Sequence, residues 1–211
     1  MQFADLPDQL PEILKKFSLD ADKSKLAALI SYLQLIKKWN KVYNLSAIRD
    51  EASMVTHHLL DSLAVVPSLH NVTRLADIGT GAGLPGMIVA IMRPELPVTL
   101  VDTVSKKTAF LQQVKIELKL DNVTVVNARV EAYQPPQLFD GIVSRAFAEM
   151  ELFVRLTRHL LADNGLWYAM KGVDPLDEIA GLPADVRVKD KYPLHVPGLD
   201  AERHLLVLER S

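Results

Sequence analysis

The sequence predicts an α/β fold, in which a mostly parallel, seven-stranded sheet carries helices on both faces and follows a helical N-terminal region. Up to about residue 70 the apolar residues recur at the three- and four-residue spacing of helices. Beyond that point short β-type runs alternate with helical stretches, which is typical of parallel strands joined by helices. We therefore expect a helical cap over residues 1–70 and a Rossmann-like body over residues 71–211, packed as one compact unit.

Three helices are predicted in the cap, over Pro7–Phe17, Lys23–Asn40 and Glu51–Val66, and Asp50 can cap the third. The second helix has the most regular apolar spacing, at Leu26, Leu29, Ile30, Leu33 and Ile36. On the third helix the expected inner face consists of Ala52, Val55, Leu59, Ser62, Leu63 and Val66. That face leaves His57 and Asp61 outside and His58 on its flank.

Seven runs in the body have the composition of strands. They cover Arg74–Ile78, Val98–Asp102, Val123–Asn127, Phe139–Ser144, Gly165–Met170, Val186–Lys191 and His204–Glu209. The last two lie close together in the chain, behind Pro and Gly residues, so we expect one of them to be antiparallel at an edge of the sheet.

Composition excludes several classes of protein. The 211 residues include 24 basic and 26 acidic side chains and no cysteine, which rules out disulfides, thiolate metal sites and cysteine nucleophiles. The apolar runs are too short to span a bilayer and the N-terminus has no basic segment followed by an apolar core, so we expect a cytoplasmic protein without membrane contact. No metal is expected, because His57, His58 and Asp61 lack a further convincing ligand. A net charge of −2 means that a nucleic-acid partner would require basic residues gathered on one face.

A glycine-rich loop between a strand and a helix is the most informative segment, reading Leu-Ala-Asp-Ile-Gly-Thr-Gly-Ala-Gly-Leu-Pro-Gly over residues 75–86. Glycines at alternate positions let the backbone turn tightly and approach a ligand. Pro85 suits a first helical turn, and the helix N-terminus can offer free N–H groups to a carboxylate or phosphate. Asp102 ends the next strand, where an acid can accept hydrogen bonds from ribose hydroxyls.

Two kinds of cofactor fit this loop. Gly81, Gly83 and Gly86 match the dinucleotide fingerprint of NAD(P) oxidoreductases, with Asp102 as the acid 21 residues after Gly81. Asp77 followed by the Gly-x-Gly-x-Gly series instead resembles the S-adenosylmethionine loop of Rossmann-like methyltransferases. Little chain remains for the second substrate region that a nicotinamide enzyme usually has, which favours the methyltransferase.

Five segments in order resemble the bacterial small-subunit rRNA guanine-N7 methyltransferases, also called the glucose-inhibited division protein B family. The resemblance covers nearly the whole chain, and the glycine loop is its least specific part. The segments are residues 39–49 (Trp-Asn-Lys-Val-Tyr-Asn-Leu-Ser-Ala-Ile-Arg), 58–63 (His-Leu-Leu-Asp-Ser-Leu), 77–86, 144–146 (Ser-Arg-Ala) and 170–172 (Met-Lys-Gly).

The resemblance implies a class I methyltransferase that transfers a methyl group from S-adenosylmethionine to N7 of one guanine, position 527 in the 530 loop of 16S rRNA, with the small ribosomal subunit as partner. It also implies cofactor contacts at Gly79, Leu84, Val130, Glu131 and Arg145. The turn that follows Asp102, Thr-Val-Ser-Lys, departs from the more polar or glycine-containing turn of many members, which leaves the local loop shape open.

The chemistry at guanine N7 requires no general base, so none is assigned. N7 carries an available lone pair in the neutral base, and the enzyme has only to align that lone pair with the methyl carbon and sulfur. Positioning candidates are Arg145, Phe147 and His58. Each has a structural alternative: an ion pair for Arg145, core packing for Phe147, and a hydrogen bond between helix and body for His58.

RNA contact is expected where basic and aromatic residues are interleaved. Residues 37–49 contain Lys37, Lys38, Lys41 and Arg49 and no acid, together with Trp39 and Tyr43. The alternative is a solvated helix end whose aromatic side chains are buried. Further candidates at strand ends are Lys106, Lys107, Lys171 and Arg203.

Three other functions remain open from the residues alone. An NAD(P)-dependent oxidoreductase would bind NAD(P) more tightly than S-adenosylhomocysteine. A noncatalytic rRNA-binding assembly factor would bind RNA without transferring methyl groups, and a small-molecule methyltransferase would leave rRNA unmodified. We expect the chain to act as a monomer.

Overall fold

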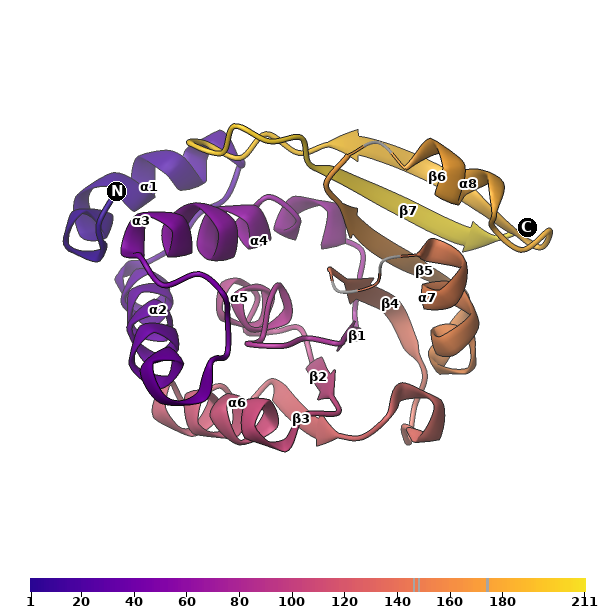
Figure 1. Cartoon of the computed structure of the whole chain (residues 1–211), viewed down its shortest axis with the longest axis horizontal. Helices are drawn as coiled ribbons and strands as arrows, with labels where there is room; N and C mark the ends of the chain where they lie inside the picture. The colour runs from indigo at the N-terminus through magenta and orange to yellow at the C-terminus, as the bar shows by residue number, and fades with distance from the viewer. Residues whose placement is uncertain (146, 148, 174) are drawn as a thin grey trace.

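The computed structural model describes residues 1–145, 147, 149–173 and 175–211, and it confirms the seven-stranded, mostly parallel sheet (Figure 1). The strand order is β3-β2-β1-β4-β5-β7-β6, and every pair from β3 to β5 is parallel. The strands are β1 (Leu75–Ile78), β2 (Val98–Asp102), β3 (Val123–Asn127), β4 (Phe139–Ser144), β5 (Leu161–Lys171), β6 (Val186–Pro193) and β7 (His204–Arg210).

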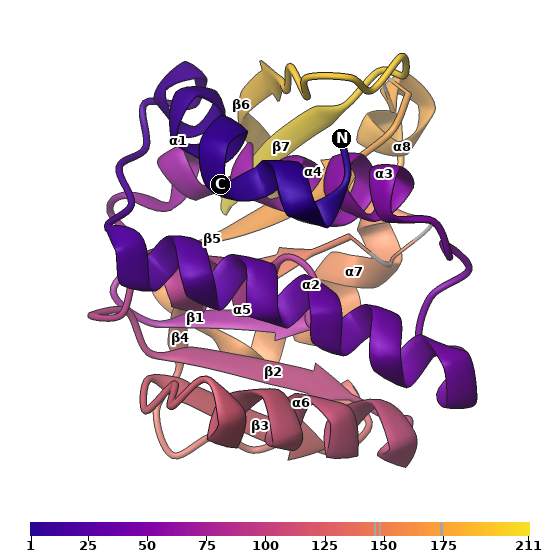
Figure 2. The same ribbon diagram turned by 90° about the vertical axis from the view of Figure 1, so that its left-hand side faces the viewer.

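Helices cover both faces of this sheet. They are α1 (Leu6–Lys16), α2 (Lys23–Tyr43), α3 (Glu51–Met54), α4 (Asp61–Leu63), α5 (Gly86–Met92), α6 (Ser105–Glu117), α7 (Met150–Thr157) and α8 (Leu176–Ala180), with 3-10 turns at Phe3–Asp5, Val66–Leu69, Val130–Ala132 and Arg158–Leu160. In Figure 2, α2 lies across the face of the sheet with α1 above it and α6 below it. Within the described residues, every helix is too short or too polar to cross a lipid bilayer.

The hydrophobic core is divided in two by the sheet. Because successive strand residues point to opposite faces, Leu75 of β1 joins the core under α2, α5 and α6, whereas Ala76 joins the core under α7. The larger core runs without a break from Phe3 in the N-terminal turn to Val207 in β7. The N-terminal helices therefore form part of one face of the sheet.

The antiparallel strand is β7, and its position corrects the expectation of an antiparallel edge. β7 pairs with β5 on one side and with β6 on the other, so the edge strand is β6, which runs parallel to β5. The reason lies in the side chains. Residues 205–208 of β7 are apolar and buried without interruption, as an interior strand requires, whereas β6 has exposed charges at Arg187, Lys189 and Lys191, as suits an edge.

The third predicted helix is continuous over residues 51–63, but its middle is a π-helix at Val55–Leu60 between α3 and α4. Asp50 caps its start as predicted, because the Asp50 carboxylate accepts a hydrogen bond from the Ser53 N–H at 2.8 Å. A π-helix holds more residues per turn than an α-helix, so side chains after it are rotated relative to an α-helical wheel. Asp61 lies in a run, residues 58–66, that is buried throughout, and it is only 2% exposed, which corrects its expected place outside the inner face.

Helix α2 touches the glycine loop directly. The fully buried Tyr32 hydroxyl of α2 donates a 2.6 Å hydrogen bond to the Ala82 carbonyl, fifty residues away in sequence. The Tyr32 ring also stacks on Phe110 of α6. The N-terminal region thus fixes the loop from the side opposite the sheet.

Replacing Tyr32 with Phe should lower the free energy of unfolding by about 1–3 kcal/mol, because the buried Ala82 carbonyl loses its hydrogen-bond donor. Denaturant unfolding measures this change, with the exposed Tyr192→Phe as the matched control. Equal stabilities for the two variants would show that the hydroxyl does not support the loop.

Candidate functional site

The glycine loop follows β1 at the carboxyl edge of the sheet, the edge at which open α/β sheets bind ligands. Gly79, Gly81 and Gly83 have φ angles of +68°, +62° and +95°, which other residues rarely adopt. A Cβ built on Gly81 would have only the Gly79 carbonyl within 4.0 Å, so this side of the loop is open. A Cβ on Gly83 would instead lie 2.7 Å from Leu111, so Gly83 serves packing rather than access.

Asp77 lies beneath the loop and is not exposed on its open side. Its side chain is fully buried, and Oδ2 accepts hydrogen bonds of 2.7 Å from both the Thr80 hydroxyl and the Gly86 N–H. The Gly86 N–H is the first of α5, and the Met87 N–H donates to the Gly83 carbonyl. The expected free N–H groups at this helix end are therefore engaged inside the protein, and Asp77 shapes the loop from below.

Asp102 ends β2 and holds two turns together. Its Oδ2 accepts a hydrogen bond from the Gly81 N–H and its Oδ1 accepts one from the Val104 N–H, both at 2.9 Å. Lys107 Nζ lies 3.9 Å from Oδ2. Because each carboxylate oxygen has two lone pairs, Asp102 keeps acceptor capacity for a ribose hydroxyl.

A cavity of about 270 Å³ lies over the open side of the loop. Four of the expected cofactor residues line it, namely Gly79, Gly81, Leu84 and Arg145, together with Leu45, Ser46, His58, Thr80, Ala82 and Lys107. The structure does not bring Val130 and Glu131 to this wall. Val130 is buried in the core under α7 and Glu131 is exposed, on the 3-10 turn after β3.

Arg145 directly follows β4, and its guanidinium is anchored inside the protein. Nη1 donates to the His57 carbonyl at 2.8 Å and to Asp61 Oδ2 at 3.0 Å. The side chain is 30% exposed and contributes to both the loop cavity and a neighbouring one. Arg145 therefore forms the ion pair that was the structural alternative. This ion pair uses Nη1, and the other guanidinium N–H groups can bind a ligand.

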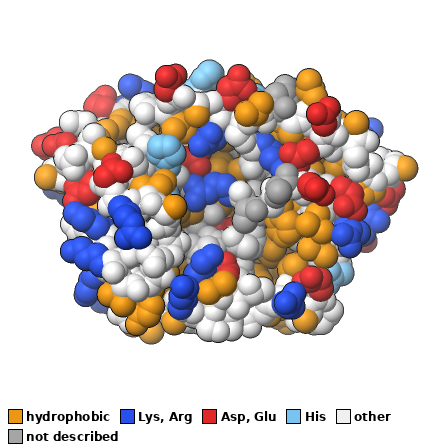
Figure 3. Space-filling view, viewed as in Figure 1, with side chains coloured by type: hydrophobic (Ala, Val, Ile, Leu, Met, Phe, Trp, Pro, Cys, Tyr) orange, Lys and Arg blue, Asp and Glu red, His pale blue; other side chains and the backbone are white. Residues whose placement is uncertain are grey.

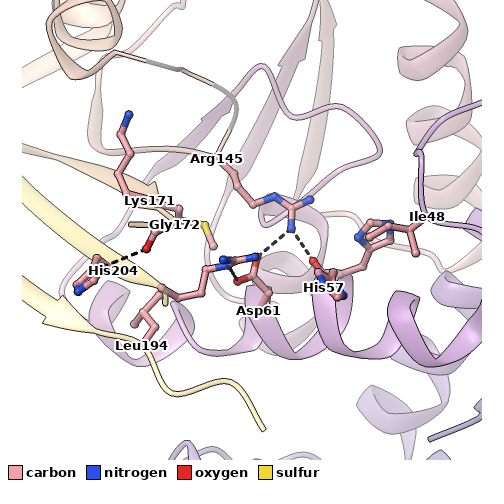
Figure 4. Close-up of a pocket in the computed structure, with 11 residues that line it drawn as sticks. Ile48, His57, Asp61, Arg145, Lys171, Gly172, Leu194 and His204 are labelled. Carbon is pink, nitrogen blue, oxygen red and sulfur yellow. Dashed lines mark hydrogen bonds and ion pairs between the residues drawn. The ribbon is translucent and has the colours of Figure 1, made fainter. Parts of the chain in front are cut away.

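The neighbouring cavity measures about 340 Å³ and lies between the helix of residues 51–63 and the ends of β5 and β7 (Figure 4). Arg145, Asp61 and His57 point toward one another on one side of it, and Lys171 and His204 come from the sheet. Its other lining residues are Ile48, His58, Met170, Gly172, Leu194 and Arg203. Arg145 and His58 are common to both cavities, so the two adjoin.

His58 is 4% exposed and neutral at physiological pH. Its Nε2 lies 2.9 Å from the Ser46 hydroxyl, which joins the helix to the segment after α2. Burial, followed by the charge of Arg145, lowers the pKa of His58 to about 4. Nδ1 has no hydrogen-bond partner among the described residues. His58 therefore combines the expected helix-to-body hydrogen bond with a place in both cavity walls.

Phe147 and Lys171 line a third hollow, beside α8. The half-buried Phe147 ring packs on Phe153 with centroids 5.2 Å apart, which favours the packing alternative over base stacking. Lys171 Nζ donates to Glu178 at 2.6 Å and to the Phe147 carbonyl at 3.1 Å. Lys171 is therefore an internal ion-pair partner in this structure, although it was expected to contact RNA.

The basic segment at the end of α2 is only partly available for RNA. Lys37 is paired with Glu51, whereas Lys38, Lys41 and Arg49 are exposed. Trp39 is half-buried and packs on Tyr43 and on Phe110, with centroid distances of 5.1 Å and 5.5 Å. Figure 3 shows Lys and Arg side chains gathered over α2 and the loop that follows it, at the left of the molecule. The other basic candidates are dispersed: Lys106 is exposed near Asp102, and Arg203 lines the second cavity.

Asp61 and Ser46 are parts of the site that the sequence did not predict. An α-helical wheel places Asp61 outward, but the structure has a π-helix before it and buries every residue from 58 to 66, so the outward side of the wheel is covered as well. Ser46 belongs to the Asn-Leu-Ser segment, but nothing in its neighbourhood indicates that its hydroxyl faces His58, twelve residues later.

A model of the GidB family, described as rRNA small subunit methyltransferase G, matches residues 25–206 of the chain. The chain is 56% identical over 203 residues to the ribosomal RNA small subunit methyltransferase G of Azoarcus sp. strain BH72, covering 96% of each protein. It is 54% identical over 198 residues to the protein of the same name from Chromobacterium violaceum, covering 94% of this chain and 95% of that one.

Solved methyltransferase structures share the fold at low sequence identity. TrmN from Thermus thermophilus matches with a TM-score of 0.56 and 17% identity, over 71% of this chain and 48% of that one. A SAM-dependent methyltransferase from Geobacter sulfurreducens, in complex with S-adenosyl-L-homocysteine, matches with a TM-score of 0.51 and 13% identity, over 72% of this chain and 90% of that one. These likenesses establish the class I methyltransferase fold.

Two of the buried titratable groups, Asp77 and His58, give stability opposite dependences on pH. Burial raises the pKa of Asp77 to about 6, so its contribution to stability is complete below the unfolded value near 3.8 and is lost as pH rises to 6. The lowered pKa of His58 means that its contribution is complete above 6.5 and is lost as pH falls toward 4.

As the pH rises from 4 to 6.5, the stability of Asp77→Asn should therefore increase by about 3 kcal/mol more than that of the wild type, because the opposing titration of Asp77 is removed. Denaturant unfolding at several pH values measures the difference, with the exposed Asp200→Asn as control. Parallel profiles for Asp77→Asn and the wild type would mean that Asp77 titrates normally.

Proposed function

Because the chain belongs to the GidB family of rRNA small subunit methyltransferase G, we propose that it methylates N7 of a single guanine, position 527 in the 530 loop of 16S rRNA. It is a methyltransferase, and its cofactor is S-adenosylmethionine. The single observation that supports the proposed chemistry most strongly is that the glycine-loop cavity adjoins a second, partly cationic cavity across Arg145.

The residues of the first cavity fit the cofactor. The open side of Gly81 lets a ligand reach the loop backbone, and Asp102 retains lone pairs for ribose hydroxyls. Arg145, anchored by Asp61 and the His57 carbonyl, has further N–H groups that can bind a carboxylate. When bound, S-adenosylmethionine supplies an electrophilic methyl group. We assign Gly79, Gly81, Leu84, Asp102 and Arg145 to holding it.

The chain's own residues have to orient the base rather than activate it. The N7 lone pair of neutral guanine is available, so alignment with the methyl group supplies most of the required catalysis. His58 is neutral at pH 7 and lies in the wall common to both cavities, where its ring, held by the Ser46 hydroxyl, can limit how a substrate lies. We assign His58 to positioning and no residue to general-base catalysis.

The RNA backbone is assigned to two basic surfaces. The first is the end of α2 and the segment after it, where Lys38, Lys41 and Arg49 are exposed and Leu45 and Ser46 lead into the cofactor cavity. The second is the rim of the second cavity at Arg203. We propose further that the chain acts as a monomer in the cytoplasm, where its rRNA substrate is found.

Transfer of labelled methyl groups from S-adenosylmethionine to RNA of unmethylated small ribosomal subunits tests the proposal. Purified protein should label 16S rRNA stoichiometrically. RNA binding without labelling would support a noncatalytic assembly factor, and labelling of small molecules alone would support a different substrate class.

Gly79→Ala and Arg145→Ala should each abolish measurable binding of S-adenosylhomocysteine while the protein stays folded. Gly79→Ala places a Cβ at φ +68° in the loop, and Arg145→Ala removes the guanidinium. Isothermal titration calorimetry measures the affinity, with Arg155→Ala of the exposed Arg155–Glu151 pair as control. Wild-type affinity in both site variants would refute the cofactor assignment.

The double variant Lys38→Ala/Lys41→Ala should weaken RNA binding and make log K less dependent on log salt by about 1.5, the effect of losing two phosphate contacts. Titrations of 16S rRNA at several salt concentrations measure the slope. The control is Lys23→Ala/Lys25→Ala, at the other end of α2. An unchanged slope in the first variant would place the RNA backbone elsewhere.

A further inference from the structure

The π-helical segment Val55–Leu60 determines where Asp61 points. The Asp61 N–H donates to the carbonyl of Thr56, five residues earlier, and also to that of His58. In an α-helix this N–H would donate to the His57 carbonyl. That carbonyl instead accepts a hydrogen bond from Arg145. The altered turn therefore presents both the His57 carbonyl and the Asp61 carboxylate to the sheet.

The Asp61 carboxylate joins two arginines that are distant in sequence. Oδ2 accepts from Nη1 of Arg145, which follows β4, and Oδ1 accepts from Nε of Arg203, which precedes β7; both distances are 3.0 Å. The Asp61 side chain is 3% exposed, while Arg145 and Arg203 are 30% and 25% exposed. The carboxylate is thus buried between two guanidinium groups whose outer parts reach the second cavity.

The second cavity has one cationic side and one apolar side. Two guanidinium groups share a single carboxylate, which leaves surplus positive charge, because Lys171 is paired with Glu178 and His58 is neutral. Ile48, Met170 and Leu194 supply apolar surface. A nucleotide, with a phosphate next to a planar base, matches this division. One guanidinium group can bind two phosphate oxygens at once, and bases pack on apolar side chains.

We propose that the second cavity receives the target nucleotide, with its phosphate on Arg203, and that Asp61 is a positioning residue that holds Arg203 on the RNA side and Arg145 on the cofactor side. This rests on the proposed function, because it places the nucleotide of that reaction. The shared residues Arg145 and His58 bring the base next to the methyl donor. Within the described residues, Asp61 is the single group bonded to both arginines, so its loss affects cofactor and RNA together.

Two variants separate the roles. Arg203→Met keeps the length of the side chain but removes the guanidinium, so KM for small subunits should rise about 10-fold, the effect of losing one charge-assisted contact. The Kd for S-adenosylhomocysteine should stay within about twofold of the wild type. Asp61→Asn keeps the size of the side chain but removes its charge, so both the subunit KM and the S-adenosylhomocysteine Kd should rise about 10-fold.

The matched control is Glu151→Gln, which removes the carboxylate of the exposed Arg155–Glu151 ion pair on α7. It should change neither the subunit KM nor the S-adenosylhomocysteine Kd. Calorimetry gives the Kd, and methyl transfer at saturating S-adenosylmethionine gives KM and kcat. A purely structural role for Asp61 would lower the melting temperature without raising either constant well below that temperature. That result would overturn the positioning role.

An unchanged subunit KM in Arg203→Met would overturn the assignment of the cavity to the nucleotide. If Asp61→Asn does not fold, Arg203→Met still tests that assignment, and Arg203→Lys, which keeps the charge without the fork, should recover part of the wild-type KM. Failure of the proposed function is distinguishable, because it would show as absence of methyl transfer to rRNA by the wild type, whereas the S-adenosylhomocysteine affinities of these variants are measured without RNA.

Discussion

The buried Asp77 carboxylate is the interaction on which the shape of the site depends. It binds the Thr80 hydroxyl and the first N–H of α5, so the loop between β1 and α5 is closed against the end of the sheet. Asp102 holds the same loop at Gly81, and Tyr32 of α2 holds it at Ala82. With these three anchors in place, the side of the loop that lines the first cavity, from Gly79 to Leu84, remains open to a ligand. The raised pKa of Asp77 is a consequence of this burial.

A second constraint is the sharing of Arg145 between two cavities. Its guanidinium is oriented by groups on a helix of the N-terminal region, the His57 carbonyl and the Asp61 carboxylate. That region therefore does more than cover the sheet: it supplies Ser46 and His58 to the cofactor side and Asp61 to the RNA side. A chain with a net charge of −2 can gather positive charge in this way, because two guanidinium groups converge where a single buried carboxylate lies between them.

The sequence was sufficient to predict the seven strands, because their apolar runs are short, contain β-branched or aromatic residues, and are bounded either by helical stretches or by Pro- and Gly-containing loops. It was also sufficient for the glycine loop, since three alternating glycines require positive φ angles that the structure contains. It could not place β7 inside the sheet, because strand order depends on tertiary packing. An interior position suits the strand whose side chains are buried on both faces of the sheet. It could not predict Asp61 either. A π-helical segment precedes that residue in the structure. Tertiary packing determines this segment, and the helical periodicity of the sequence does not indicate it.

A base held beside the glycine-loop cavity should be methylated at N7 without a general base. Mass spectrometry of nucleosides and fragments from unmethylated small subunits, after incubation with the protein and S-adenosylmethionine, identifies the modified atom and nucleotide. We expect one N7-methylguanosine, located in the 530 loop of 16S rRNA. Methylation of an exocyclic amine or of a pyrimidine carbon would contradict this expectation, because each of those reactions requires activation that this site does not provide.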